Sequence, residues 1–169
     1  MIRKQVSRID IIAEDLGYLT DSVRELVKIS GFPGMRVLEF AFGGEVENDY
    51  LPHNYIPNTI VYTGTHDNET LMQYLRGLPE YQKTFLMEYV GRFSVSDEEL
   101  CEALIRLAMS SVADTCIVPI QDYLALGEEA RINFPSTVGN NWKWRLDREQ
   151  LTDALAERIS RLTNLYARG

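Results

Sequence analysis

The abrupt end of one apolar run constrains this chain more than any other feature. Residues 60–63, Ile-Val-Tyr-Thr, are apolar or β-branched, and the polar string THDNET follows at residues 65–70. Such a run is typical of a strand buried in a parallel sheet. The two residues after His66 can cap a helix predicted over residues 69–76. His66 and Asp67 are therefore expected where a strand ends and a helix begins, which is where barrel enzymes carry their chemistry. In isolation the pair is better explained as a simple helix cap.

Further apolar segments alternate with helical patterns, so that the predicted strands are residues 9–13, 35–42, 60–63 and 115–120. Continuously apolar strands that alternate with helices imply a parallel sheet covered on both faces, which is an α/β fold. Four such strands fit a small open sheet or half of an eight-stranded barrel. Polar groups follow three of them, and because the carboxyl ends of parallel strands meet at one edge, these groups are expected to converge there. They are Glu14-Asp15, His66-Asp67 and Gln121-Asp122.

Two capping boxes predict the starts of two long helices. The boxes are Ser96 with Glu99 and Asp147 with Gln150. The inward-facing residues are expected to be Leu100, Leu104, Leu107 and Ala108 in the first helix and Leu151, Leu155, Ile159 and Leu162 in the second. A further helix is predicted over residues 21–30, closed by Gly31. Segments without a clear period are predicted to be long loops, which are often functional; they are residues 45–58 and 127–144.

Composition excludes several classes of function. The chain has 169 residues, 45% of them hydrophobic, which fits a single domain over residues 1–169 with a sizeable core. Its net charge of −8 disfavours nucleic acids and anionic membranes as partners, and no apolar run approaches the roughly 20 residues of a membrane span. Cys101 and Cys116 show no pairing motif and are predicted to be reduced core residues of a cytoplasmic protein. With only two histidines, neither a metal site nor a cofactor is predicted.

Six ordered segments resemble the amylomaltases, which are also called 4-α-glucanotransferases or disproportionating enzymes. The segments span residues 11–146 and read IIAEDLG, GFPGMRVLEFAF, YLPHNY, VYTGTHDNET, QDYLALGEEARIN and NNWKWRL. The resemblance implies the C-terminal half, strands five to eight, of a (β/α)8 TIM-type barrel. It also implies an activity in starch, glycogen and maltodextrin metabolism, in which a segment of α-1,4-glucan moves to the hydroxyl of an acceptor sugar.

The resemblance implies roles for four residues. Glu14 matches the general acid/base, and Asp67 matches a carboxylate that holds sugar hydroxyls and stabilises the transition state. His66 matches the histidine partner of that carboxylate, and Asn141 matches a sugar-contacting asparagine. Retaining glycosyl transfer also needs a nucleophilic carboxylate, which lies roughly 5–5.5 Å from the acid/base. The acid/base later deprotonates the incoming hydroxyl.

Further substrate contacts are expected from Asp15, which follows Glu14 at the same strand end, and from aromatic side chains. A transferase must let a sugar reach the covalent intermediate before water does, so aromatic platforms for the acceptor matter. Trp142 is the platform residue that we assign to substrate binding. Other aromatic candidates are Trp144, Tyr50 and Tyr55. Core packing is the simpler explanation for each of these side chains taken singly.

The chain departs from the family's pattern at the nucleophile. That aspartate is expected after strand four, in an Arg-x-Asp-His motif, but only thirteen residues precede Glu14. Asp10 resembles it superficially, yet it lies in the run that leads directly to Glu14. The chain is therefore predicted to be inactive alone, and to self-associate or pair with an N-terminal half, because strands five and eight lack a neighbour. Gly43 stands where many relatives carry an aspartate, so one expected sugar contact is not carried over.

Two other functions stay open. The chain is compatible with a non-catalytic glucan-binding or purely structural segment. A metal-dependent α/β hydrolase would use Asp15, His66 and Asp67 as ligands, although the sequence has no spacing typical of a metal motif. A chelation test of activity would separate that hydrolase from a glucan transferase.

Overall fold

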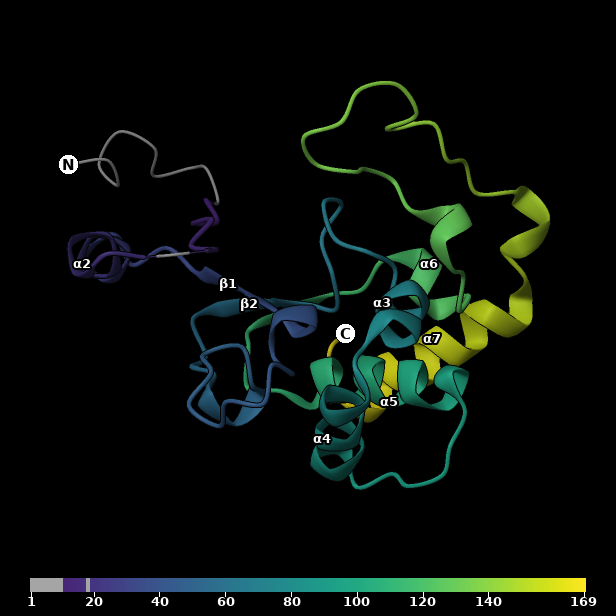
Figure 1. The fold of residues 1–169 in the computed structure, drawn as a ribbon, viewed down its shortest axis with the longest axis horizontal. Helices are drawn as coiled ribbons and strands as arrows, with labels where there is room; N and C mark the ends of the chain where they lie inside the picture. The colour runs from purple at the N-terminus through teal and green to yellow at the C-terminus, as the bar shows by residue number, and fades with distance from the viewer. Residues whose placement is uncertain (1–10, 18) are drawn as a thin grey trace.

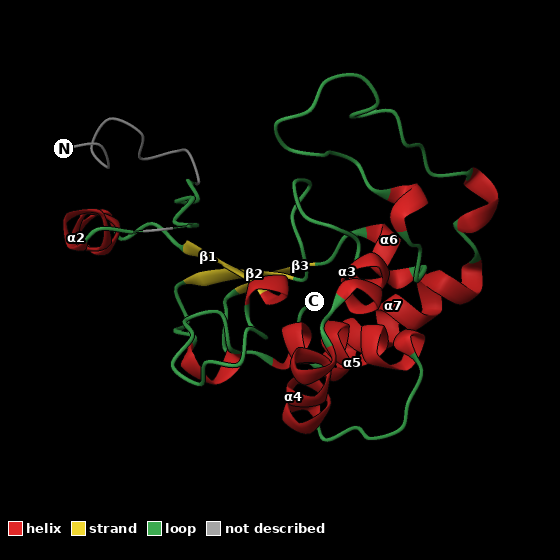
Figure 2. Cartoon of the chain, in the orientation of Figure 1, coloured by secondary structure: helices red, strands yellow, loops and turns green. Residues whose placement is uncertain are grey.

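Three parallel strands form the centre of the computed structural model, which describes residues 11–17 and 19–169 (Figure 2). Their order in the sheet is β1-β2-β3, and their bounds are Gly34–Val37, Thr59–Tyr62 and Thr115–Ile117. Val37 pairs with Tyr62 and Tyr62 pairs with Ile117, so the carboxyl ends of the strands lie level at one edge. Ala13 adds a single parallel bridge to Gly34 beside β1. The predicted parallel α/β arrangement is confirmed over this part of the chain.

The predicted strand over residues 60–63 is confirmed as β2, whereas the one over residues 35–42 is too long. β1 stops early because the chain winds into the 3-10 turn η1, Leu38–Phe40. Ala41 and Phe42, which follow this turn, are buried completely or nearly so. An apolar run of this kind fits a buried helical turn as well as a strand, and periodicity alone does not separate the two.

The last predicted strand is also shorter than expected. β3 stops because Pro119, which has no N–H for a strand ladder, precedes the short helix α6, Ile120–Tyr123. Gln121 and Asp122 therefore stand inside a buried helix and not at the free end of a strand, contrary to prediction. Of the first predicted strand, residues 9–10 lie outside the described residues, and with them the aspartate that superficially matches the nucleophile motif.

The helices lie at both ends of the sheet (Figure 1). α2, Asp21–Ser30, lies beyond β1, and α3 to α7 gather around the opposite end. The bounds are Leu71–Gly77 for α3, Glu80–Val90 for α4, Asp97–Ser110 for α5 and Asp153–Leu165 for α7. Further 3-10 turns are η2, Pro52–Asn54, η3, Glu128–Ala130, and η4, Arg148–Gln150. Gly31 closes α2 in the left-handed conformation, as predicted.

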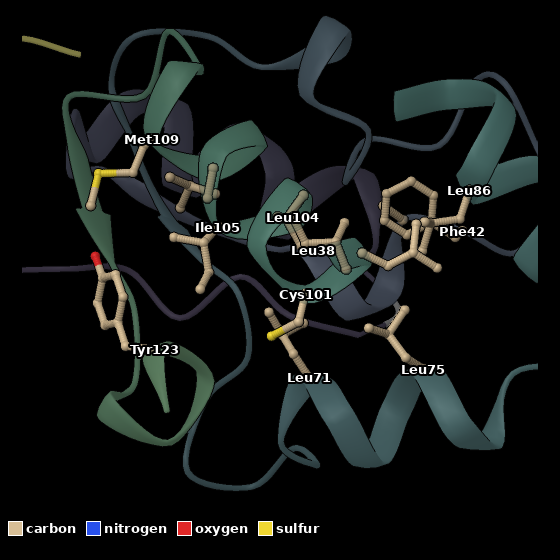
Figure 3. Close-up of a cluster of buried hydrophobic side chains, with 14 of the residues drawn as sticks. Leu38, Phe42, Leu71, Leu75, Leu86, Cys101, Leu104, Ile105, Met109 and Tyr123 are labelled. Atoms are coloured by element: carbon tan, nitrogen blue, oxygen red, sulfur yellow. The ribbon is translucent and has the colours of Figure 1, made fainter. Parts of the chain in front are cut away.

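α5 lies at the centre of the hydrophobic core (Figure 3). Its predicted capping box is present: Ser96 Oγ accepts from the Glu99 N–H at 3.2 Å, and Glu99 Oε2 accepts from the Ser96 N–H at 2.8 Å. The segment at residues 45–58 adds Leu51 and Tyr55 to the same core, so this predicted loop is packed against the fold. Other buried members come from β2, η1 and the helices; they include Val61, Leu38, Leu71, Leu75, Leu86, Leu100, Leu104 and Ala108.

The last helix starts later than predicted. The capping box of Asp147 and Gln150 is present, but it begins the 3-10 turn η4 and not the last helix. α7 is capped instead by Thr152, whose Oγ1 accepts from the Leu155 N–H at 3.2 Å. Leu155 is buried as predicted, whereas Leu151 precedes the helix and is 57% exposed.

Both cysteines are free thiols. Cys101 is buried in α5 and Cys116 is half-buried in β3, and burial raises the pKa of the two thiols to about 12 and about 11 respectively. The prediction of unpaired cysteines inside the fold is confirmed. Among the described residues, no helix is both long and apolar enough to cross a membrane.

We predict that the chain self-associates. Within the described residues β3 has a strand neighbour on one side only, and Leu26 and Ile29 of α2 are 63% and 73% exposed. Unpaired strand edges and exposed apolar side chains both favour association. Light scattering over a concentration series should give a mass that rises above the 19.4 kDa of one chain. A constant mass of one chain at high concentration would contradict this prediction.

Candidate active site

A cavity of about 750 Å³ lies at the carboxyl ends of the strands. Its wall brings together Glu14, His66 and Asp67, which lie far apart in the sequence. Glu14 follows the bridge at Ala13, and the other two follow β2. The side chains of His66 and Asp67 are 55% and 52% exposed, so they are open to a ligand. The structure thus brings these three residues to one cavity, as their places at strand ends predict.

The Asp67 carboxylate is held from two sides. The His66 Nε2 lies 3.3 Å from Asp67 Oδ1, and Asn133 Nδ2 donates a hydrogen bond to the same oxygen at 2.6 Å. Arg131 Nη2 donates to the Asp67 backbone carbonyl at 3.3 Å. Because neighbours fix both the side chain and the backbone, Asp67 presents its carboxylate in a defined orientation.

Asn68 closes the turn that carries His66 and Asp67. Its Oδ1 accepts from the Thr65 N–H at 3.0 Å and from Thr65 Oγ1 at 2.6 Å, and Thr65 Oγ1 lies 3.3 Å from the Asp67 N–H that donates to it. The expected role of Asp67 and Asn68 as helix caps is therefore wrong. α3 is capped by Thr70, whose Oγ1 accepts a hydrogen bond within the first turn of the helix.

Arg131 fastens the segment at residues 127–144 to this turn. Its Nη1 donates to Glu69 Oε1 at 3.3 Å, and its guanidinium carbon lies 4.4 Å from the centre of the Phe134 ring. The side chain is only 13% exposed, so these contacts are partly shielded from water and stronger than surface pairs. The long segment is thus a fixed wall beside the turn.

Asn141 and Trp142 were both predicted to bind substrate, but they have different environments. Asn141 is bonded within its own loop, whereas Trp142 is exposed. Asn141 Oδ1 accepts from the Phe134 N–H at 2.9 Å and its Nδ2 donates to the Thr137 carbonyl at 3.1 Å, so its amide shapes the loop. Trp142 has φ +63°, a conformation that a tryptophan rarely adopts. The residue is 57% exposed, and the centre of its ring lies 5.1 Å from that of the His66 ring.

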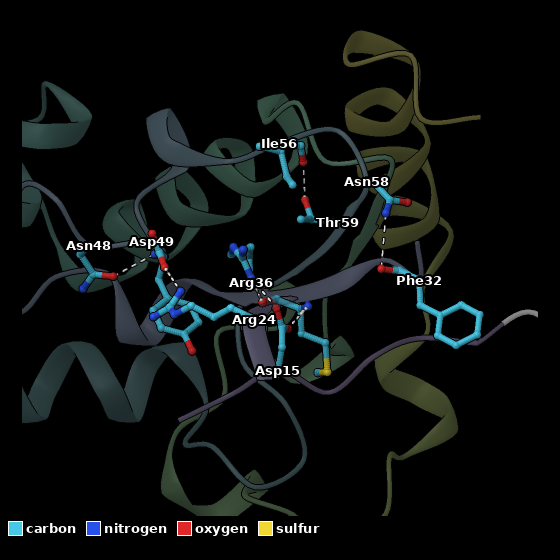
Figure 4. A network of polar contacts seen from close by, with 11 residues as sticks. Asp15, Arg24, Phe32, Arg36, Asn48, Asp49, Ile56, Asn58 and Thr59 are labelled. Atoms are coloured by element: carbon cyan, nitrogen blue, oxygen red, sulfur yellow. Dashed lines mark hydrogen bonds and ion pairs between the residues drawn. The ribbon is translucent and has the colours of Figure 1, made fainter. Parts of the chain in front are cut away.

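Asp15 does not line the cavity that contains Glu14. It is 7% exposed, and its Oδ1 accepts from the Met35 N–H at 2.6 Å while its Oδ2 pairs with Arg36 at 3.2 Å (Figure 4). A Cβ on Gly34 would lie 2.5 Å from this carboxylate, so a glycine is required there. The structure gives Asp15 the task of anchoring the strand that leads to Glu14 against β1.

Asp122 lies behind the site and is 2% exposed. Thr63 Oγ1 donates to Asp122 Oδ2 at 2.6 Å, and the Leu71 N–H donates to Oδ1 at 2.9 Å, so one carboxyl group joins β2, α3 and α6. Burial raises its pKa to about 6, against the opposing effect of these two hydrogen bonds. Asp122 was expected at the edge of the sheet where the polar groups converge, and this prediction is wrong. The residue is buried and supports the end of β2 from inside the fold.

Sequence reasoning missed Glu39, the second buried carboxyl group behind the site. Glu39 lies in η1 and its Oε1 is buried without a hydrogen-bond partner among the described residues. The signal was present, because one glutamate interrupts the apolar run VLEFAF at residues 37–42. A charged residue in a run that is otherwise buried needs a structural or functional reason.

The remaining candidates divide between core and surface. Tyr55 is a core residue whose hydroxyl donates to the Tyr50 carbonyl at 2.8 Å, and Tyr50 packs edge-on against Phe40 at 5.3 Å. The three ligands of the hypothetical metal hydrolase are not brought together, because Asp15 pairs with Arg36 outside the cavity. Over residues 11–17 and 19–169, no group of three or more His, Cys, Asp or Glu side chains is placed to hold a metal ion.

Comparisons with known proteins agree on one family. The family model described as 4-alpha-glucanotransferase matches residues 1–152. The 4-alpha-glucanotransferase of Clostridium butyricum is 48% identical over 99% of this chain and 34% of its own length, and the chloroplastic/amyloplastic enzyme of Solanum tuberosum is 43% identical over 98% and 28%. The solved structure of amylomaltase from Streptococcus agalactiae in complex with acarbose has a TM-score of 0.92 at 36% identity, over 99% of this chain and 34% of that one. The chain thus spans about a third of the length of these relatives.

Replacing Thr63 with valine should destabilise the fold in a pH-dependent manner. The substitution removes the donor to a buried carboxylate, and a hydrogen bond to a charged group contributes about 1.5–3 kcal/mol. We expect a loss of this size by urea unfolding at pH 8, where Asp122 is ionised, and a smaller loss at pH 5, below its pKa of about 6. Thr163→Val removes a hydroxyl that bonds within α7 and should show no such pH dependence. An equal loss for Thr63→Val at both pH values would contradict the prediction.

Proposed function

This chain belongs to the 4-alpha-glucanotransferase family, and from this membership we propose that it forms the C-terminal half of a glucanotransferase barrel. Strand five is the segment that ends at Ala13, and β1, β2 and β3 are strands six, seven and eight. Residues 1–169 then form one domain. The parallel order of the strands, the helices around them and the span of about a third of the relatives' length support this proposal.

The activity that we propose is transfer of an α-1,4-glucan segment to an acceptor sugar with retention of configuration. The observation that carries it is the single cavity whose wall holds Glu14, His66 and Asp67 at the ends of parallel strands. A cavity of about 750 Å³ is large enough for a small oligosaccharide. Retaining glycosyl transfer needs an acid/base carboxyl group beside its nucleophile, and Glu14 on this wall is reachable from solvent. Asp67 on the same wall matches the further carboxylate of the family.

Each residue has a step in this mechanism. A carboxylate from the portion upstream of Glu14 attacks the anomeric carbon, and the glycosidic bond breaks as Glu14 donates its proton to the leaving oxygen. Glu14, now ionised, takes the proton of the acceptor hydroxyl as that oxygen attacks the covalent intermediate and releases the nucleophile. Asp67 accepts hydrogen bonds from sugar hydroxyls while positive charge develops on the ring. His66 and Asn133 hold Asp67 in the orientation that this requires.

Trp142 is the aromatic platform in this proposal. Trp142 does not itself line the cavity, but its exposed ring stands beside His66, which does, and sugar rings pack well on flat aromatic faces. Asn141 contributes by keeping the loop in shape, and Asp15 by fixing the strand that carries Glu14. A maltooligosaccharide is the substrate that fits this arrangement. A cytoplasmic location stays a prediction, and the potato relative is named as chloroplastic/amyloplastic.

The chain alone should bind glucan without transferring it. The cavity, the stabilising carboxylate and the aromatic platform all lie within the described residues, whereas the mechanism takes its nucleophile from upstream of Glu14. Acarbose, the ligand in the solved Streptococcus agalactiae complex, is a suitable probe of binding. This second candidate function, a non-catalytic glucan-binding segment, is thus the expected behaviour of the isolated chain.

The decisive assay uses maltotriose and a chimera in which this chain replaces the matching third of the Clostridium butyricum relative. We expect the isolated chain to leave maltotriose unchanged and the chimera to release glucose together with longer oligosaccharides. Robust transfer by the isolated chain would contradict the role of the upstream portion. A folded chimera that releases no products would contradict the proposed function.

Two substitutions in the chimera test the assigned roles. Glu14→Gln should abolish transfer, because the amide protons are far too weakly acidic to protonate the leaving oxygen. Asp67→Asn should lower kcat by roughly 10²-fold or more, the size seen when a charge-stabilising group is lost. Glu80→Gln and Asp49→Asn change exposed carboxylates outside the cavity and should leave the rate unchanged. A chimera that keeps its rate with Glu14→Gln would assign the acid/base elsewhere.

A further inference from the structure

Arg131 donates hydrogen bonds from all three nitrogens of its guanidinium group. Nε donates to the Asn133 carbonyl at 3.0 Å, and Nη2 donates to the Asp67 carbonyl at 3.3 Å. Nη1 pairs with Glu69 Oε1 at 3.3 Å. Asp67 and Glu69 belong to the turn after β2, whereas Asn133 belongs to the segment at residues 127–144. One planar group therefore holds the backbone of both segments.

The two residues whose carbonyls Arg131 holds are also bonded to each other through their side chains. Asn133 Nδ2 donates to Asp67 Oδ1 at 2.6 Å, and this bond is exposed to solvent. A single hydrogen bond of this kind is weak in water, because water competes for both partners. Its geometry therefore depends on how firmly the two backbones are held, and Arg131 contacts both of them.

The Arg131 side chain starts from a fixed base. Ala130, the residue before it, is fully buried, and its carbonyl accepts from Gln121 Nε2 of α6 at 3.3 Å. The Arg131 N–H donates to the Glu128 carbonyl at 3.1 Å, which closes η3. The guanidinium carbon also lies 4.4 Å from the centre of the Phe134 ring. The group is thus held at its root and on one face, so that it can serve as a fixed support for the turn.

We propose that Arg131 is a positioning residue: its three donors hold Asn133 against Asp67 and thereby set the direction in which the Asp67 carboxylate enters the cavity. The effect on the position of the turn is independent of any activity. The effect on glucan transfer rests on the proposed function.

This role needs an arginine and not only a positive charge. A guanidinium group presents its donors in a rigid plane and can serve several acceptors at once. A lysine would keep a charge to pair with Glu69, but its compact ammonium group cannot reproduce the planar fork that also reaches the carbonyls of Asp67 and Asn133. Arg131→Lys therefore separates the fork from the charge.

Arg168 provides a matched control, because its guanidinium also donates from three nitrogens to three backbone carbonyls. These acceptors lie at the end of α5 and just after it; they are the carbonyls of Met109, Ser111 and Ala113. Arg168 does not line the cavity that contains Asp67. Arg168→Lys thus removes a fork of the same kind at a different place in the fold. Urea unfolding should show a loss of stability in both variants.

The first experiment records the imidazole proton signals of both variants by NMR at a constant pH. The His66 ring lies beside Asp67 and near the Trp142 ring, so a displacement of the turn or of the segment changes its signals. We expect the His66 signals to shift in Arg131→Lys and to stay in place in Arg168→Lys.

The signals of the other histidine serve as an internal reference. The chain has only two histidines, and the His53 ring bonds to Tyr89. Its signals should not move in either variant.

Unmoved His66 signals in folded Arg131→Lys would overturn the proposal, and so would an equal shift in Arg168→Lys. If Arg131→Lys does not fold, Phe134→Leu carries the test alone. That change removes the ring from the face of the guanidinium and leaves the arginine in place. The His66 signals should then shift by a smaller amount, and the absence of any shift would overturn the proposal.

The second experiment measures kinetics in the chimera with maltotriose. Arg131→Lys should lower kcat and kcat/KM together, by roughly tenfold to 10²-fold, because a misplaced Asp67 loses its effect in the transition state. Arg168→Lys should leave both constants unchanged once the rates are corrected for the folded fraction. A rise in KM with an unchanged kcat would contradict the assigned effect on transfer.

A double substitution tests whether Arg131 acts through Asn133. In a chimera that carries Asn133→Ala, Arg131→Lys should lower kcat by a smaller factor than in the parent chimera, because the bond that Arg131 positions is already absent. Equal factors in the two backgrounds would show that Arg131 acts independently of Asn133 and would overturn this part of the proposal.

The NMR measurements use neither glucan nor turnover. They can succeed while the parent chimera transfers no glucan, in which case the proposed function fails and the structural role of Arg131 stands. They can also fail while the parent chimera is active, in which case only the role of Arg131 fails. The two proposals are therefore separable.

Discussion

Buried negative charge behind the end of β2 is the constraint on which the rest of this site depends. Asp122 is accommodated there because Thr63 and the N–H of Leu71 both donate to it, and this joins a strand and two helices at one carboxyl group. Such a group is costly to bury unless its oxygens are satisfied. The nearby Arg131 pairs with Glu69, and in doing so it brings the long segment after α6 against the turn.

The exposed and buried parts of the site have different tasks. His66 and Asp67 are half exposed, so their orientation depends on the residues that contact them from behind and beside. Asn68 closes their turn from within, and Asn133 reaches Asp67 from the neighbouring segment. A functional side chain is only as well placed as the residues that support it.

Local signals in the sequence predicted local structure well. The capping box at Ser96 and the strand at residues 60–63 depend on neighbours in the chain, and both are present. The turn after β1 could not be predicted, because a buried apolar run fits either structure. The cavity at the strand ends followed from parallel topology alone. The burial of Glu39 against Gly64 could not be predicted, because the two residues come from segments that the sequence does not mark as close.

The adjacent polar pair Glu14-Asp15 shows how two neighbouring polar residues at a strand end can take different tasks. Successive side chains in an extended segment point to opposite faces, so a residue that faces the cavity places its neighbour against the fold. Glu14 lines the cavity, and Asp15 accepts from Met35 and pairs with Arg36 on the other side. Among the described residues, the segment ending at Ala13 has one bridge to the sheet. The contacts of Asp15 with Met35 and Arg36 are therefore important for the position of Glu14. The sequence marks the pair, and the alternation of side chains along the extended segment decides which member faces the cavity.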